Sequence, residues 1–183
     1  MIQFYKPNAK VTGTACSFWV NKDGSIMTSM IKQDSWNDIK KIGSFVKNKD
    51  NPNARVIVKL SRIEVAGIID AMERESEFKS YHSSQNQVLQ IRFGLYIDKG
   101  SGEKKGFSFS VNKQEKEDST AKTGFIIGFT YPEARLLKHD LSTCLSQTQA
   151  QPVQKEKNYD PAPVKQIESQ NPQPQASSEE DLW

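Results

Sequence analysis

Residues 56–64 read VIVKLSRIE and residues 125–133 read FIIGFTYPE. Each stretch begins with the apolar pattern of a β-strand and runs directly into a hydroxyl residue, Ser61 or Thr130, followed three residues later by Glu. This spacing is a capping box, in which the hydroxyl accepts from a free backbone N–H and the carboxylate reaches back to the cap. The chain therefore contains the same strand-to-helix junction twice.

A hairpin pattern precedes each junction. Asp23-Gly24 lies between two apolar runs in the first half, and a Gly-rich turn at 98–102 does the same in the second. When the two halves are aligned, Phe18 lies over Leu95. We expect strands over residues 14–20, 26–32, 55–60, 88–97, 106–112 and 124–129, and helices over 62–75 and from Ala134 to Leu145. A short strand within 43–46 is a further candidate.

These patterns predict an α+β, antiparallel β-rich domain built as a duplicated strands-then-helix unit. The expected domain covers residues 1–145, with its pseudo-repeats at 10–78 and 86–145. An OB-fold, with five strands and a helix after the third, is the alternative, because three strands, a helix and two strands also occur in this order.

Charge divides the chain into a basic body and an acidic end. The net charge is +3, but residues 146–183 carry three lysines against six carboxylates, whereas the remainder carries 22 cations against 16 anions. The segment 146–178 is rich in Gln, Pro and Ser, and we expect it to be a disordered linker. The tip at 179–183 reads EEDLW and suits partner docking, through Glu179, Glu180, Asp181, Leu182 and Trp183.

Strand alternation predicts an outward face that suits single-stranded nucleic acid. The register of the repeat gives Trp19 and Tyr96 equivalent outward positions. Aromatic rings stack on unpaired bases, and neighbouring cations contact phosphates. Trp36 fits either a stacking residue or a loop anchor. The candidate nucleic-acid-binding residues are Trp19, Lys22, Lys32, Trp36, Lys59, Arg92, Tyr96, Ser108, Ser110, Asn112 and Lys113.

We predict no enzyme, because no nucleophile–base arrangement, phosphate-binding glycine loop or metal-ligand spacing is evident. No cofactor and no metal are expected. His82 is predicted to be an exposed loop residue, and Cys16 a small core residue. The N-terminus lacks the pattern of a signal peptide, and no apolar run reaches the ~20 residues of a membrane span. A cytoplasmic location, in a bacterial or phage-infected cell, is the expectation.

Two parts of the chain resemble known families. The acidic tip ending in Trp183, after a Gln/Pro linker, resembles the tails of bacterial and bacteriophage single-stranded-DNA-binding proteins, which usually end in Phe. The junctions at 60–65 and 129–134, and the strand start at Lys105-Gly106, resemble the Whirly and positive-cofactor-type coactivator group. The resemblance implies a sheet that binds single-stranded DNA, a homo-oligomer, and replication or repair proteins recruited by the tip.

Three functions remain open at this point. The first is protection of single-stranded DNA in replication, recombination or repair. The second is a transcription regulator or coactivator that binds melted DNA. The third is an oligomeric interaction module that uses the face of Trp19 and Tyr96 for assembly. RNA is a further possible ligand, because no residue pattern reads a 2′-hydroxyl.

Overall fold

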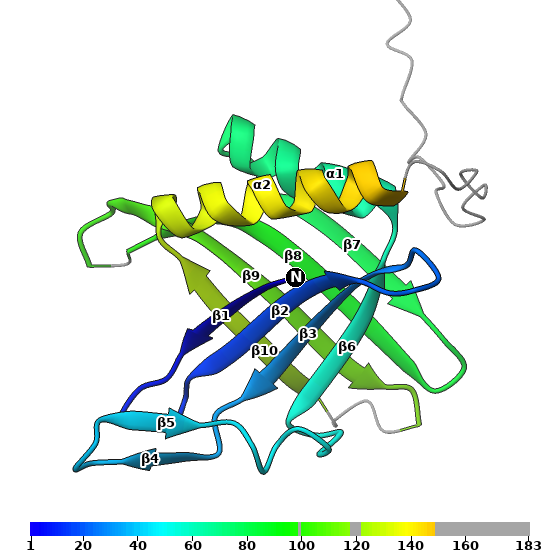
Figure 1. The fold of residues 1–183 in the computed structure, drawn as a ribbon. Coiled ribbons are helices and arrows are strands. Elements are labelled where there is room, and N and C mark those ends of the chain that lie inside the picture. Colours follow the sequence, from blue (N-terminus) through cyan, green and yellow to red (C-terminus); the bar gives the residue numbers. More distant parts are fainter. Residues whose placement is uncertain (99, 118–121, 149–183) are drawn as a thin grey trace, which may run out of the picture. The chain divides into compact units, whose positions relative to one another are not determined.

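The computed structural model of the protein describes residues 1–98, 100–117 and 122–148. Within these ranges, ten strands and two helices follow one another along the chain (Figure 1). Their bounds are β1 Ile2–Lys6, β2 Thr14–Val20, β3 Ile26–Lys32, β4 Ser35–Asn37, β5 Ile42–Ser44, β6 Arg55–Leu60, α1 Arg62–Arg74, β7 Phe78–Ser83, β8 Gln87–Ile97, β9 Lys104–Glu115, β10 Lys122–Phe129 and α2 Tyr131–Thr148.

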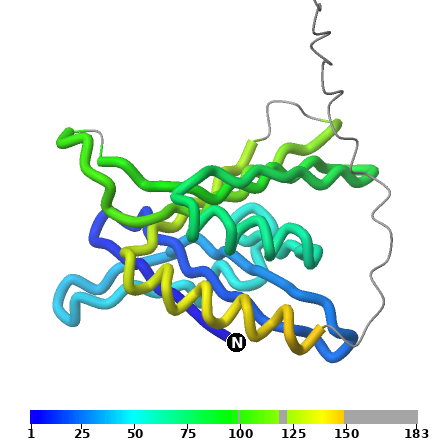
Figure 2. Tube along the Cα trace, turned by 90° about the horizontal axis from the view of Figure 1, so that it is seen from above, coloured from blue at the N-terminus to red at the C-terminus, as the bar shows by residue number. Residues whose placement is uncertain are grey.

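The strands form two four-stranded antiparallel sheets with the orders β1-β2-β3-β6 and β10-β9-β8-β7, and β4 pairs with β5 in a separate hairpin. Each half of the described chain thus places four antiparallel strands before one helix. The predicted α+β, antiparallel β-rich class is confirmed at this level. Both helices lie on the same side of the two sheets (Figure 1 and Figure 2).

The inner faces of the two sheets share one core with the helices. The Phe18 ring in β2 lies 5.6 Å from the Phe109 ring in β9, and the Phe4 ring in β1 lies 4.9 Å from the Phe129 ring in β10. Aromatic pairs at these separations add directional attraction to the burial of their area. The outer faces of the two sheets consequently point away from each other.

Two strands of the four-stranded sheets are absent from the sequence-based prediction, as is β4 of the small hairpin. β1 begins at Ile2, well before residue 10, where the first repeat is expected to start. β7 occupies the segment around His82 for which a loop is predicted. Each of these strands is the outermost member of its sheet, next to β2 or β8. They complete two matching sets of four strands.

The predicted capping box at Ser61 is confirmed. The Ser61 hydroxyl accepts from the Glu64 N–H at 3.1 Å, and the Glu64 carboxylate accepts from the Ser61 N–H at 2.9 Å. At the second junction, the Glu133 carboxylate accepts both the N–H and the hydroxyl of Thr130. The hydroxyl thus donates to its own box partner, so only the backward-reaching half of the second box is formed.

The second helix continues to Thr148, three residues past the predicted boundary at Leu145. Thr148 is buried, which explains why the helix does not end where the apolar spacing ends. The rest of the predicted linker and the acidic tip lie outside the described residues. Among the helices of the described ranges, none is long and apolar enough to span a membrane.

Candidate nucleic-acid interface

The outer face of the first sheet is ordered in cross-strand rows. One row runs from Tyr5 through Ala15 and Ile31 to Arg55. A second row runs from Trp19 through Met27 to Lys59. Each row therefore has an aromatic residue at one end and a cation at the other. We call this surface the Trp19 face, made of Gln3, Tyr5, Ser17, Trp19, Ser29, Arg55 and Lys59.

The row between these two has small or polar side chains on β1, β2 and β3 and ends at the exposed Ile57 on β6. Gln3, Ser17 and Ser29 lie opposite one another across β1, β2 and β3. Ala15 lies in the row of Tyr5, and Trp19 is four positions later in the same strand. At the usual strand rise, the two rows are therefore about 13 Å apart along the strand. The two aromatic side chains therefore flank a floor that combines the small polar Ser17 and Ser29 with the apolar Ala15 and Ile31.

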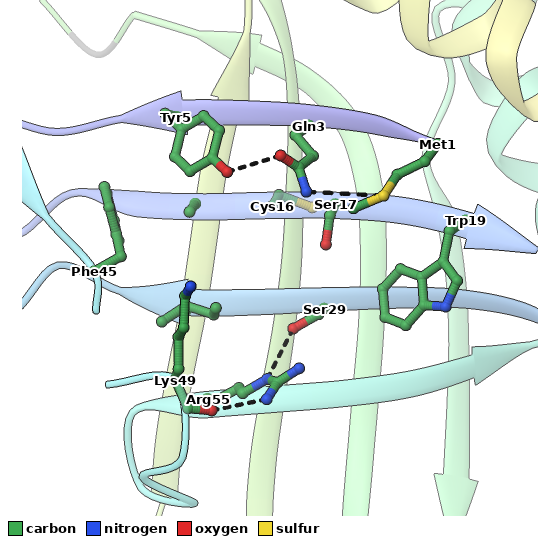
Figure 3. Close-up of a pocket in the computed structure, with 12 residues that line it drawn as sticks. Met1, Gln3, Tyr5, Cys16, Ser17, Trp19, Ser29, Phe45, Lys49 and Arg55 are labelled. Carbon is green, nitrogen blue, oxygen red and sulfur yellow. Dashed lines mark hydrogen bonds between the residues drawn. The ribbon is translucent and has the colours of Figure 1, made fainter. Parts of the chain in front are cut away.

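The Trp19 face is hollowed. A pocket of about 420 Å³ is lined by Tyr5, Trp19 and Arg55, together with Phe45 and Lys49 from the segment after β5 (Figure 3). The Tyr5 and Phe45 ring centroids are 5.9 Å apart. In Figure 3, Trp19 lies at one end of the hollow, Tyr5 and Phe45 at the other, and strands of the second sheet cross behind. No carboxylate side chain is among the lining residues.

Arg55 is held flat against the sheet by two hydrogen bonds. Its Nε donates to the Ser29 hydroxyl at 3.3 Å, and its Nη1 donates to the Lys49 carbonyl at 2.7 Å. Within the described part of the chain, neither Arg55 nor Lys49 forms an ion pair. A guanidinium held in this way presents its remaining N–H groups in a fork that matches a phosphate.

Trp19 and Lys59, the two ends of the second row, have polar neighbours in the turn between β2 and β3. The Trp19 indole N–H donates to the Asn21 side-chain oxygen at 2.7 Å, which orients a half-buried ring. Lys59 faces Asp23, whose pKa is lowered chiefly by hydrogen bonds from Ser25 and to a smaller extent by Lys59. Lys59 is thus the less available of the two cations for a phosphate.

The predicted outward face is divided between two sheets. Trp19 and Lys59 lie on the Trp19 face, but Tyr96, Arg92, Ser108, Ser110 and Asn112 lie on the outer face of the second sheet. Each residue points outward as predicted. The expectation that Trp19 and Tyr96 share one continuous surface was wrong, because the core between Phe18 and Phe109 separates their sheets.

Lys32 and Lys113 are on the inner faces of their sheets, not on the outward faces that carry Trp19 and Tyr96. Lys32 lies opposite buried Thr14, and its Nζ is 5.2 Å from the centroid of the Phe125 ring. Lys113 lies opposite buried Leu89, and its Nζ is 3.6 Å from the Glu115 carboxylate. The alternation of each strand continues to its last residues, and it turns both lysines inward.

The remaining predicted contacts lie outside both rows. Lys22 is exposed in the β2–β3 turn. Trp36 lies in β4 of the small hairpin, opposite Gly43, and its indole N–H donates to the Asp38 carboxylate at 3.1 Å. Trp36 therefore sits in a hairpin strand rather than a loop. The predicted partner-binding tip lies outside the described residues.

The four aromatic or basic residues of the hollow other than Trp19 are not among the candidates that the sequence patterns indicate. Tyr5 belongs to the unpredicted strand β1, and Phe45 and Lys49 follow the short β5 strand. Arg55 was detectable, because it is four residues before Lys59 in the same strand and shares its face. The spacing of Phe45 and Lys49 carries no such signal, since they reach the sheet from an irregular segment.

A second polar cluster joins helix α1 to strand β7. The buried carboxylate of Glu64 accepts from the Ser80 hydroxyl and from the His82 ring nitrogen Nε2, the latter at 2.7 Å. Burial opposes the charge on Glu64, but these hydrogen bonds and that from the Ser61 N–H outweigh it, so the Glu64 pKa is lowered. His82 is therefore part of a helix-to-strand contact rather than an exposed loop.

No protein-family model and no curated protein matches this chain. The interpretation of the Trp19 face therefore depends on its own residues and geometry.

Proposed function

We propose that the protein binds single-stranded DNA through the Trp19 face, with little sequence preference. Bases would stack on Trp19 and on the ring pair of Tyr5 and Phe45, while Arg55 and Lys49 contact phosphates. Every base offers a flat face, so stacking of this kind tolerates any sequence. The small side chains of Ser17 and Ser29 allow the strand to approach the sheet.

One observation carries this proposal. Two rows of the same face each combine an aromatic residue with a cation, Tyr5 with Arg55 and Trp19 with Lys59. Both rows border a hollow whose lining includes no carboxylate side chain. A surface for an apolar protein partner would not need a guanidinium that is oriented by hydrogen bonds but has no carboxylate partner among the described residues.

We also propose that the fold is the Whirly-like, duplicated strands-then-helix type. The four strands of each sheet lie side by side in chain order, and the last strand of each sheet, β6 or β10, is followed directly by a helix. This arrangement supports a duplication more than it supports a five-stranded OB barrel, which has one helix after its third strand. Self-assembly into a homo-oligomer is part of the same proposal.

The biological role proposed is the protection of single strands during replication, recombination or repair, without catalysis. The acidic tip at 179–183 would recruit other proteins of these processes. A transcription regulator that binds melted DNA would use the same face but need no such recruitment. Removing residues 179–183 separates the two roles, because only the first loses partner recruitment while DNA affinity is retained or raised.

Fluorescence anisotropy of a labelled oligo-dT, compared with a duplex of equal length at two salt concentrations, tests the binding proposal. We expect tight, salt-sensitive binding that prefers the single strand. If the protein instead binds neither DNA, or binds both equally, the proposal fails. A change in assembly on Trp19→Ala, measured by analytical ultracentrifugation without any DNA binding, would support an interaction module instead.

A further inference from the structure

The outer face of the second sheet holds two cations directly opposite each other. Lys79 in β7 is paired in register with Arg92 in β8, and both side chains are exposed. Like charges at directly opposite positions of an antiparallel pair repel each other and destabilise the sheet. Glu77 pairs with Lys79 at 2.7 Å and offsets part of this repulsion, so Arg92 is the member of the pair that points to an anionic ligand.

Aromatic residues lie on both sides of this pair of cations. Tyr81 is opposite Gln90, two residues from Arg92, and Tyr96 is four residues from Arg92 in the other direction. At the usual rise these separations are about 7 Å and about 13 Å along the strand. The Tyr81 and Tyr96 side chains are 64% and 46% exposed, so both rings are available for stacking.

Small residues form the floor between these rings. Arg92 is opposite Ser110, and Gly94 is opposite Ser108. A trough of about 400 Å³ lies over Arg92, Gly94, Ser108 and Ser110. We call this surface the Arg92 face, made of Lys79, Tyr81, Gln90, Arg92, Tyr96, Ser108 and Ser110.

Two acidic residues, Glu75 and Glu77, also line this trough, with Glu77 beside Gly94, and both are engaged by lysines. Glu77 pairs with Lys79 at 2.7 Å, and Glu75 pairs with Lys104. Arg92 itself has no ion pair or hydrogen bond from its side chain to another described residue. Its guanidinium therefore remains available for a phosphate, as that of Arg55 does on the Trp19 face.

The two faces are directed away from each other. The ring contacts Phe18–Phe109 and Phe4–Phe129 join the sheets through their inner sides. One short strand of nucleic acid therefore contacts either the Trp19 face or the Arg92 face of a given chain, but not both. Two faces that each combine aromatic rings with an arginine provide sites for two separate strands.

We infer that the Arg92 face is a second single-strand-binding surface, and that each chain holds two strands at once and brings complementary strands together for annealing. This inference rests on the proposed function, because it extends the same stacking and phosphate chemistry to the opposite side of the molecule. It adds a strand-bridging activity that the Trp19 face alone does not provide.

Native mass spectrometry with oligo-dT of about six nucleotides tests the inference, since such an oligonucleotide is short enough for one face. The spectrum reports the number of chains and of oligonucleotides in the same complex. We expect two oligonucleotides per chain for the wild type. We expect one for the Trp19→Ala/Lys59→Ala variant, one for the Tyr81→Ala/Arg92→Ala variant, and two for Arg135→Ala, which removes an exposed cation from α2.

Energy transfer between donor- and acceptor-labelled complementary strands measures annealing by the same proteins. The Tyr81→Ala/Arg92→Ala variant should retain binding of one oligonucleotide per chain and lose at least tenfold in annealing rate. Circular dichroism and the chain count check that this variant folds and assembles as the wild type does.

The outcomes separate the inference from the proposed function. One oligonucleotide per wild-type chain, lost on Trp19→Ala/Lys59→Ala, would overturn the second surface and leave the Trp19 face intact. Two oligonucleotides per chain in the Tyr81→Ala/Arg92→Ala variant would also overturn it. No binding by the wild type would overturn both proposals.

Discussion

Trp19 and Lys59 lie in one cross-strand row of the first sheet, with Met27 between them. Tyr5 and Arg55 end another outward row in the same order, with the row of Ser17 and Ser29 between the two. The sheet therefore repeats an aromatic residue on its β1–β2 side and a cation on its β6 side. In the proposed complex, this repetition would orient the bound strand, with its bases towards β1 and β2 and its phosphates towards β6.

Lys59 on the outer face of the first sheet and Lys32 on its inner face should differ in their contribution to the salt dependence of DNA affinity. Removing one cation that neutralises a phosphate of a single strand makes the slope of log affinity against log salt shallower by about 0.7. Lys59→Ala should produce part of this change, because Asp23 already offsets some of its charge, whereas Lys32→Ala should leave the slope as it is in the wild type, because Lys32 faces Phe125. Anisotropy titrations at several salt concentrations measure both slopes. Equal slopes for the two variants would contradict the placement of Lys59.

The contribution of Arg55 to oligo-dT binding should depend on the geometry of its guanidinium as well as on its charge. Arg55→Lys keeps the charge but loses the planar group held by Ser29 and the Lys49 carbonyl. We expect Arg55→Ala to weaken oligo-dT binding most, and Arg55→Lys to be intermediate. Arg135→Ala, on helix α2, is the control for loss of charge alone. If Arg55→Lys matched the wild type, the guanidinium would have no specific role.

An inner and an outer residue of β2 should contribute very differently to the stability of the fold. Phe18 is completely buried and contacts the Phe109 ring. Phe18→Ala should lower the free energy of unfolding by about 3–5 kcal/mol, because it removes a ring from the core and leaves a cavity. Ser17→Ala, one residue away on the outer face, should change it by less than about 0.5 kcal/mol. Urea unfolding followed by circular dichroism measures both values.

Glu64 should make stability depend on pH. Its pKa in the folded protein is lowered from the ordinary 4.5, so its ionised form contributes stability above that value. This contribution is lost as the pH falls through the lower folded pKa. Glu64→Gln should cost about 1–3 kcal/mol at neutral pH, since a buried, charged acceptor of three hydrogen bonds is lost.

Urea unfolding at neutral pH and at about pH 3 tests the Glu64 prediction, because the wild-type advantage should shrink on acidification. Glu73→Gln is the matched control, since Glu73 is an exposed residue that pairs with Lys138. A surface pair of this kind contributes at most about 1 kcal/mol. An unchanged advantage of the wild type at low pH would contradict the role assigned to the Glu64 charge.

Much of the fold could be predicted from local patterns. The capping boxes mark where β6 and β10 end, and alternation identifies β2, β3, β8 and β9. Strand β7 escaped because its inward residues Ser80 and His82 are polar. They face the Glu64 carboxylate instead of the apolar core, so the strand lacks the usual contrast between its two sides.

The candidate site was harder to predict than the fold. Alternation correctly turned Trp19 and Tyr96 outward, but it does not specify which strands pair. Pairing depends on contacts between residues far apart in the chain, and here it places β2 and β8 in different sheets. Lys113 could have been assigned inward, because it continues the series of Phe107, Phe109 and Val111.

The fluorescence of Trp19 tests the central claim most directly. The chain has three tryptophans, so the Trp36→Phe/Trp183→Phe variant leaves Trp19 as the only one. Stacking of a base on this ring should quench its emission in proportion to oligo-dT bound, and Trp19→Ala should weaken binding by about 5- to 150-fold. Emission that stays constant while anisotropy reports binding would contradict the assignment of the Trp19 face.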